Sequence, residues 1–133
     1  MSDDRMETLL ALYEAISERD FDDLLQYLHP AVELHPAVGG ELDMGTTYRG
    51  HEGMRQFIET AWEGFEVAVE PEEMTDAQDD RILATERWQV RARDGIETEI
   101  QLSEIYTFRD GLIVGIDGFR DHAEALEAAG LTE

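Results

Sequence analysis

Hydrophobic residues follow a helical period in the first half of the chain. Over residues 4–19 they recur at intervals of three and four positions, which is the spacing of an amphipathic helix. The stripe consists of Met6, Leu9, Leu10, Tyr13 and Ile16. Asp20 is a typical N-cap for a second short helix that continues to Pro30, and a third helix is predicted over residues 51–62. Between these two helices, the segment AVELHPAVGG predicts a short strand and a turn at Gly39-Gly40.

From residue 65 onward the period changes to two, which is typical of strands with one buried face. The predicted strands cover residues 65–74, 81–93, 96–108 and 112–119. A last helix over residues 121–129 ends at Gly130. Three helices followed by an antiparallel meander predict one α+β domain over residues 1–133. A chain of this length can bury a core and still leave room for a modest pocket.

The dipeptide Asp110-Gly111 predicts a two-residue hairpin turn of type I′, because both central residues of that turn need positive φ. Counting back from the turn in steps of two places Glu104 directly opposite Asp117, on an otherwise apolar face. Two carboxylates in a poorly solvated place cannot easily both ionise, so one pKa should rise. A bulge in this hairpin would instead send the two acids to opposite faces.

A second two-residue turn at Asp94-Gly95 would place Arg87 and Gln89 on the face of Glu104 and Asp117. The other face of the sheet would then hold Trp88, Val90, Ile105, Leu112, Val114 and Ile116. Such a face is too apolar to be left in water. We therefore expect a homodimer in which a second copy of the chain covers the outer sheet face.

The charge of the chain is strongly negative. There are 32 acidic residues against 10 basic ones, all of them arginine, and the net charge is -22. This balance excludes nucleic acid as a partner, because phosphate binding requires a basic surface. Without cysteine there is neither a disulfide nor a thiolate metal site. No apolar run is long enough for a membrane span and the N-terminus lacks signal-peptide features, so we expect a soluble cytoplasmic protein with no membrane partner.

Several segments resemble the nuclear transport factor 2-like superfamily and, within it, the SnoaL-like group of polyketide cyclases and ketosteroid isomerases. They are YRGHEGMRQFI, YTFRDGLIVGIDGFRD and the trailing AEALEAAGL. The resemblance covers nearly the whole chain. It implies a cone-shaped (cystatin-like) fold in which a curved antiparallel sheet wraps around N-terminal helices. It also implies a small apolar ligand in the open end of the cone and pairing through the outer sheet face.

The ketosteroid isomerases of this group use a base next to a proline and a neutral carboxylic acid in their oxyanion hole. By resemblance, these positions correspond to His35, before Pro36, and to Glu104. Their oxyanion tyrosine would fall near Leu12, one position from Tyr13. The related limonene epoxide hydrolases use an Asp, Arg, Asp arrangement. This chain resembles it at Arg87 and, for the second acid, at Asp117, whereas Gln89 stands where the other Asp would be.

The leading hypothesis is an isomerase or cyclase that works without a cofactor and moves a proton on a carbon next to a carbonyl. The candidate catalytic residues are His35, Glu104 and Asp117, with His35 as proton shuttle and either neutral Glu104 or Tyr48 as hydrogen-bond donor to the enolate. The candidate substrate-binding residues are Tyr13, Tyr48, Trp62, Arg87, Gln89, Tyr106 and Phe119.

Other interpretations remain open. The aromatic residues are equally suited to a hydrophobic core, and Arg87 could simply anchor Glu104 and Asp117 in a salt-bridge network. The protein could be a non-catalytic ligand-binding or dimerisation module, and an epoxide hydrolase is a third reading. No metal is expected, because the His and Glu residues concerned lack the spacing of metal ligands; they are His29, His35, His51 and Glu52.

Overall fold

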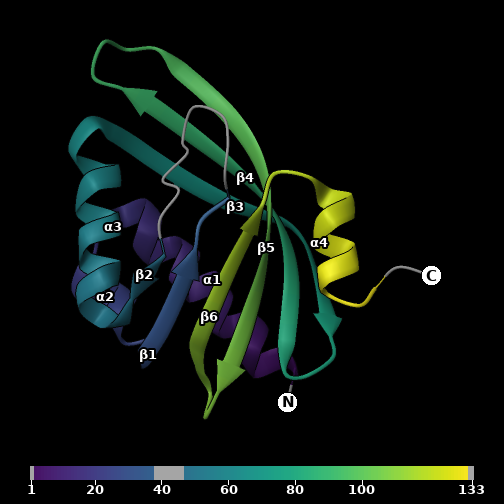
Figure 1. Ribbon diagram of the computed structural model, residues 1–133. Helices are drawn as coiled ribbons and strands as arrows, with labels where there is room; N and C mark the ends of the chain where they lie inside the picture. The colour runs from purple at the N-terminus through teal and green to yellow at the C-terminus, as the bar shows by residue number, and fades with distance from the viewer. Residues whose placement is uncertain (1, 38–46, 132–133) are drawn as a thin grey trace.

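The computed structural model describes residues 2–37 and 47–131, and the predicted turn at Gly39-Gly40 lies outside them. It confirms an α+β fold in which the N-terminal helices pack against a curved, unclosed sheet (Figure 1). The helices are α1 (Ser2–Glu18), α2 (Phe21–Leu25), α3 (Gly50–Gly64) and α4 (His122–Ala128). The strands are β1 (Leu28–His35), β2 (Tyr48–Arg49), β3 (Phe65–Ala77), β4 (Arg81–Ala92), β5 (Glu97–Arg109) and β6 (Leu112–Phe119).

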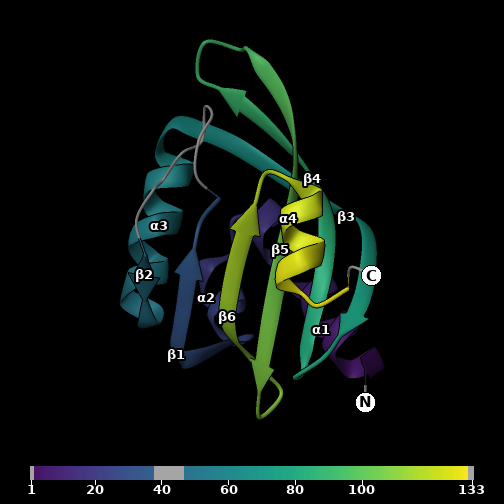
Figure 2. The same ribbon diagram turned by 45° about the vertical axis from the view of Figure 1, so that its right-hand side comes forward.

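The sheet has the strand order β2-β1-β6-β5-β4-β3. The predicted meander is confirmed, since β3, β4, β5 and β6 pair in sequence and antiparallel. Strand β1 joins it in parallel to β6, so one side of the sheet is mixed. Figure 2 shows α1 on one face of the sheet and α4 on the other. The face towards α1 holds the main hydrophobic core, and we call it the inner face.

Helix α2 begins as predicted, because the Asp20 side chain accepts a hydrogen bond from the backbone N–H of Asp23 at 3.0 Å. It ends at Leu25, however, and the prediction that it continues to Pro30 is wrong. Leu28 already belongs to β1 and pairs with β6, where the N–H of Ile113 donates to the preceding Tyr27 carbonyl. Long-range strand pairing therefore overrides the helical spacing of the leucines.

Helix α4 covers part of the outer face. Its N-cap is Asp121, and its Ala125 packs in a cluster with Leu83 and Ile105 of the sheet. The outer apolar face predicted to bind a second copy is therefore covered in part by the chain itself. Three residues assigned to that face line the interior instead: Trp88, Val90 and Ile116. The homodimer stays a prediction.

In the part of the chain that the structure describes, no helix is both long and apolar enough to span a membrane.

Candidate functional site

The hairpin between β5 and β6 has the predicted turn but not the predicted register. Asp110 and Gly111 have φ of 53° and 80°, as a type I′ turn requires. A bulge follows in β6, where Phe108 pairs with Ile113 while Thr107 already pairs with Gly115. One extra residue in a strand reverses the face of every residue beyond it.

The predicted pairing of Glu104 with Asp117 is therefore wrong. Glu104 lies opposite Gly118, whereas Asp117 lies opposite Ile105. Glu104 is buried on the inner face, and Asp117 is half-exposed on the outer face. The two acids do not form a dyad.

The turn between β4 and β5 differs from the prediction by one residue. Ala92 donates to the Ile96 carbonyl at 2.9 Å, so three residues form the turn, and Gly95 takes the positive φ of 90°. As a consequence, Arg87 pairs with Gln101 and Ala84 pairs with Glu104. The residues with even numbers in β4, among them Glu86 and Trp88, point inward. The placement of Arg87 and Gln89 on the inner face is wrong.

The corrected registers bring a buried polar cluster together. Its residues are Tyr13 of α1, Glu86 and Trp88 of β4, and Glu104 and Tyr106 of β5. Glu86 is fully buried at 0% exposure and lies at the centre. Its Oε2 accepts hydrogen bonds from the hydroxyls of Tyr13, at 2.7 Å, and Tyr106, and its Oε1 accepts from Trp88 Nε1 at 2.9 Å. The Tyr106 hydroxyl also lies 2.8 Å from Glu104 Oε2.

This cluster needs one carboxyl proton. Four of its contacts join a phenol or the indole to a carboxyl group, namely Tyr13–Glu86, Trp88–Glu86, Tyr106–Glu86 and Tyr106–Glu104, and the two carboxyl groups also share a hydrogen bond. The two phenols and the indole supply one donor each, which makes three. The Tyr106 hydroxyl can donate to only one of its two carboxyl neighbours, so the other must donate to it. A single proton shared between Glu86 and Glu104 satisfies these four contacts.

The surroundings of Glu86 favour its holding that proton. Burial raises the pKa of the Glu86 carboxyl well above its usual range, and the charge of Glu104 and a hydrogen bond to it raise this pKa further. The hydrogen bonds from Tyr106 and Tyr13 lower it, but they are the smaller effects. Burial also raises the pKa of both phenols, so they stay protonated as donors. The resulting chain runs from Glu86 through Tyr106 to a Glu104 carboxylate.

A cavity of about 210 Å³ adjoins the cluster on the inner side of the sheet. Most of its lining is apolar and comes from α1, α3, β1 and the sheet, for example Leu12, Phe57, Trp62, Val90 and Ile116. Glu104 and Tyr106 line it too, as does Arg120 just beyond β6. Glu104 is 8% exposed. It is thus the acid through which the buried proton chain reaches the cavity.

His35 lies apart from this cavity. Leu34 of β1 lines the cavity, whereas the neighbouring His35 is exposed on the alternate side of the strand. Its Nδ1 lies 3.1 Å from Thr47 Oγ1, and its Nε2 lies 3.3 Å from Glu33 Oε1 and 4.0 Å from Asp117 Oδ1. The expectation that His35 faces Glu104 is wrong, because the alternation of β1 turns His35 to the side of Asp117, although its neighbours Leu34 and Pro36 line the cavity.

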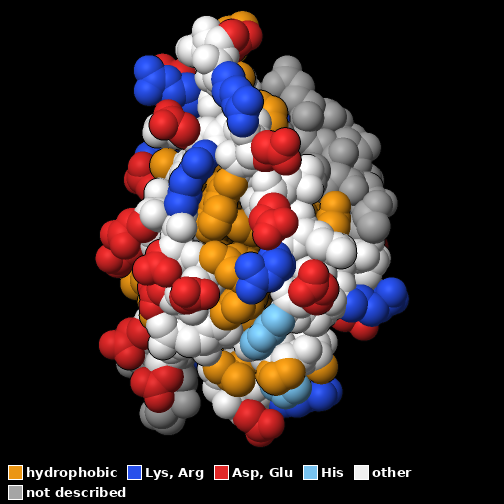
Figure 3. Space-filling model, turned by 90° about the vertical axis from the view of Figure 1, so that its left-hand side faces the viewer, with side chains coloured by type: hydrophobic (Ala, Val, Ile, Leu, Met, Phe, Trp, Pro, Cys, Tyr) orange, Lys and Arg blue, Asp and Glu red, His pale blue; other side chains and the backbone are white. Residues whose placement is uncertain are grey.

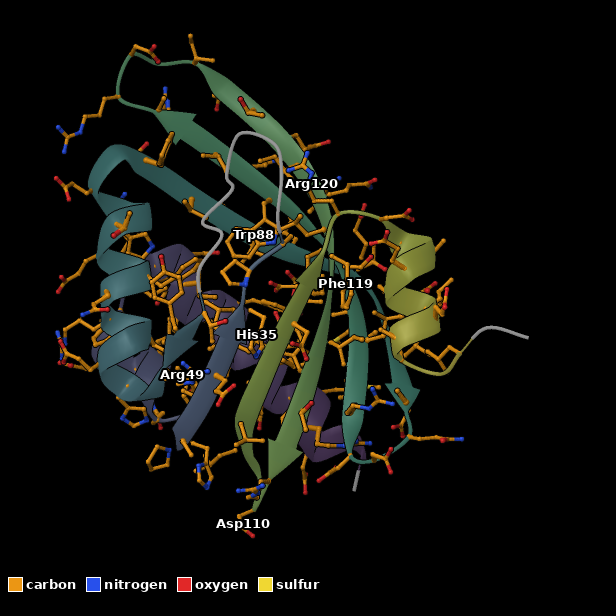
Figure 4. All side chains as sticks on the ribbon, in the orientation of Figure 1. His35, Arg49, Trp88, Asp110, Phe119 and Arg120 are labelled. Carbon is orange, nitrogen blue, oxygen red and sulfur yellow. The ribbon has the colours of Figure 1, made fainter. Side chains whose placement is uncertain are left out.

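The predicted substrate-binding residues divide into three groups. Trp62 and Tyr106 line the cavity, and Tyr13 lies behind it in the polar cluster. Arg87 and Gln89 are on the outer face, where Arg87 pairs with Glu70 at 3.3 Å. Tyr48 packs edge-on against Phe57, with ring centroids 5.2 Å apart, and Phe119 packs on the α4 side of the sheet (Figure 4). Neither Tyr48 nor Phe119 is part of the cavity lining.

Three residues at the site were not anticipated: Glu86, Trp88 and Arg120. For Glu86 a signal existed, since it interrupts the apolar alternation Ile82, Ala84, Trp88, Val90 in the way that Glu104 interrupts that of β5. The wrong register concealed it. Arg120 had no such signal, because it follows the end of β6 and its position depends on how the chain turns towards α4.

Among the described residues, no group of three or more His, Cys, Asp or Glu could hold a metal ion.

Comparison with known proteins agrees with this architecture. The family model for the SnoaL-like domain matches residues 9–127. No curated protein matches at a significant level.

Three solved structures show the same nuclear transport factor 2-like fold. TerC, co-crystallised with polyporic acid, is 27% identical, with 96% of this chain and 98% of that chain covered and a TM-score of 0.74. A protein of unknown function from Burkholderia pseudomallei is 24% identical, with coverages of 95% and 97% and a TM-score of 0.75. RV0760c from Mycobacterium tuberculosis, in complex with estradiol-17beta-hemisuccinate, is 18% identical, with coverages of 87% and 92% and a TM-score of 0.76.

Proposed function

Because this chain belongs to the SnoaL-like domain family, we propose that it binds a small, mostly apolar molecule in the cavity and moves a proton on it. The reaction class is that of an isomerase or cyclase acting without a cofactor. The apolar lining suits the body of such a molecule. Two of the similar structures, TerC and RV0760c, are named for complexes with small organic molecules, which supports this use of the fold.

The observation that carries the proposal is the position of Glu104. It lines an apolar cavity and connects through the Tyr106 hydroxyl, 2.8 Å away, to the buried Glu86. With the shared proton on Glu86, Glu104 faces the cavity as a carboxylate and can act as a general base. The apolar lining keeps water away from the place where the proton would be transferred.

In the proposed step, the Glu104 carboxylate takes a proton from a carbon next to a carbonyl, which leaves an enolate and a neutral Glu104. Arg120, which also lines the cavity, supplies positive charge for the enolate oxygen. An isomerase returns the proton to a different carbon. A cyclase lets the enolate carbon attack a second carbonyl carbon of the same molecule, which forms a C–C bond, and Glu104 protonates the resulting alkoxide.

His35 and Asp117 have no part in this proposal, since both lie outside the cavity lining. Tyr13 and Trp88 act as positioning residues, because they hold Glu86 through hydrogen bonds.

A non-catalytic binding protein is the second candidate, and the largely apolar lining favours it, because apolar burial alone can hold a ligand. The two candidates differ in whether C–H bonds of a bound molecule are broken. The experiment incubates the protein in D2O with a panel of cyclic and open-chain ketones. NMR then measures how fast deuterium is incorporated at the carbon next to the carbonyl. The catalytic proposal expects exchange that the wild-type protein accelerates, and Glu104→Gln should slow it at least about 100-fold.

Two further variants make the experiment selective. Asp117→Asn removes an acid from the outer face and should leave the exchange rate unchanged. Glu86→Gln keeps the shape of the buried group but removes its titration, so it should alter the pH dependence of exchange more than its maximal rate. Binding of the ketones without any accelerated exchange would instead identify a binding protein.

A further inference from the structure

A second depression in the surface is lined by several of the few basic residues of the chain. This groove has a volume of about 560 Å³ and lies where the end of α3, the start of β3 and the β4–β5 turn meet. Arg19, Arg91 and Arg93 line it, which is three of only 10 basic residues in a chain of net charge -22. Figure 3 shows basic side chains gathered at the top of this side of the molecule, above a central zone of hydrophobic side chains.

Two of these arginines are held by neutral groups. Arg19 Nη2 donates to the carbonyls of Trp62, at 3.1 Å, and Phe65, and Arg93 Nη2 donates to the carbonyl of Glu63. These carbonyls belong to the C-terminal end of α3, so the arginines cap the helix. A carbonyl carries only a partial charge, and each guanidinium has five N–H donors. Capping therefore fixes both groups in place without neutralising them.

Acidic residues offset part of the charge. Glu63 and Glu66 also line the groove, and Arg91 lies 3.6 Å from Glu66. Both side chains of this pair are exposed, at 58% and 70%, and a pair of that kind is weak and easily exchanged for another anion. The groove thus has three cations against two carboxylates, on a surface that elsewhere is dominated by acids.

The groove and the cavity have a common wall. Trp62 and Phe65 line both of them. These two aromatic residues are therefore the part of the wall that a molecule in the cavity would have to pass to reach the groove. The cavity lining is mainly apolar and contains both Glu104 and Arg120, so the three arginines of the groove offer a charged end a further place beside the cavity.

We propose that the groove binds the anionic end, a carboxylate or phosphate, of the same molecule whose apolar body occupies the cavity. This inference rests on the proposed function and names its substrate class as amphipathic acids. Arg91 and Arg93 bind the anion from the β4–β5 turn, and Arg19 does so from the end of α1. The bound anion replaces Glu66 as the partner of Arg91.

The test uses two matched series of probes, phenylalkanoates and the corresponding phenylalkanols, with increasing chain length. Their dissociation constants are measured by displacement of the neutral fluorophore N-phenyl-1-naphthylamine. Once the chain is long enough to pass Trp62 and Phe65, the carboxylate should bind about fivefold or more tightly than the alcohol, although the overall charge of the protein repels it. The preference should shrink with added salt.

The double variant Arg91→Gln, Arg93→Gln should abolish the preference and leave alcohol binding unchanged. Arg49→Gln is the matched control, because it also removes an exposed arginine but lies at the other end of α3, paired with Glu33 at 3.4 Å (Figure 4). It should keep the preference.

Each other outcome overturns the inference. If alcohols bind but carboxylates are never preferred, or if Arg49→Gln removes the preference equally, the groove is not an anion site and the proposed cavity function stands. If neither series displaces the fluorophore at any length, both the groove and the cavity proposals fail.

Discussion

A carboxyl group has different surroundings on the two faces of the sheet. Glu104 and Asp117 lie on neighbouring strands, one residue out of step, so that Glu104 is opposite Gly118 and Asp117 is opposite Ile105. On the inner face Glu104 meets a phenol that also contacts a second acid. On the outer face Asp117 meets solvent and His35, 4.0 Å away. A single bulged residue thus decides which acid joins a shared-proton network.

The two faces differ in the groups that offset the cost of burying a carboxyl group. Inside, the partners of Glu86 are uncharged hydrogen-bonding groups, Tyr13, Tyr106 and Trp88, and one proton completes the network. Outside, burial raises the pKa of Asp117, while the charges of His35 and Arg81 lower it. The inner acids are therefore expected to control folding and chemistry together, whereas the outer acid contributes only weak ion pairs.

The largest expected effect comes from removing the central acid of the inner face. Glu86→Ala takes away the hydrogen-bond partner of Tyr13, Trp88 and Tyr106 and leaves a hole in a fully buried site, so we expect the free energy of unfolding to fall by about 3–5 kcal/mol. Urea denaturation followed by circular dichroism measures the change. The outer-face counterpart, Glu33→Ala, removes exposed ion pairs to His35 and Arg49 and should change stability by less than about 1 kcal/mol. Equal losses of unfolding free energy in Glu86→Ala and Glu33→Ala would contradict the difference between the inner and the outer face.

A second prediction concerns the pH dependence of stability. Because the pKa of Glu86 is raised in the folded protein, the folded state keeps a proton that an unfolded Glu releases above its usual pKa of about 4.3. The stabilisation that protonated Glu86 contributes is therefore fully present below that pH. It is lost as pH rises towards the raised pKa, by up to about 1.4 kcal/mol per pH unit.

Glu86→Gln isolates this contribution, because the amide mimics the neutral acid and does not titrate. The difference in unfolding free energy between wild type and Glu86→Gln should shift in favour of the variant from about pH 5 to about pH 8. A difference that stays constant across this range would mean that Glu86 is ionised in the folded protein.

The sequence was sufficient for the type of most elements but not for the side of the sheet on which each residue lies. The helical stripe of α1, the four meander strands and the capping Asp20 are local features, and the structure has them. The face of a residue depends on the whole register from the turn onwards. Both hairpins were shifted by one residue, at the β4–β5 turn and at the β6 bulge.

These shifts explain the outcome at the candidate site. Glu104 was identified correctly as a buried acid, since its own strand alternates as expected. Its partner was misidentified because Asp117 lies beyond the bulge. A two-residue Asp94-Gly95 turn would have put Glu86 on the outer face, whereas the actual three-residue turn puts it inside. No local pattern distinguishes a two-residue from a three-residue loop when both use an Asp-Gly pair.

The smallest expected effect tests the outer acid alone. Asp117 is 44% exposed, and its pKa is raised because burial and the charge of Glu33 together outweigh the opposite effect of His35 and Arg81. Asp117→Asn removes both effects, so the unfolding free energy at neutral pH should change by less than about 1 kcal/mol, and the sign should favour the variant. The folded pKa is the higher one, so any gain should disappear as the pH falls and Asp117 itself becomes neutral. Urea denaturation at pH 7 and near pH 4 measures both points, and a clear loss of stability in Asp117→Asn would show that the outer ion pairs matter as much as the inner network.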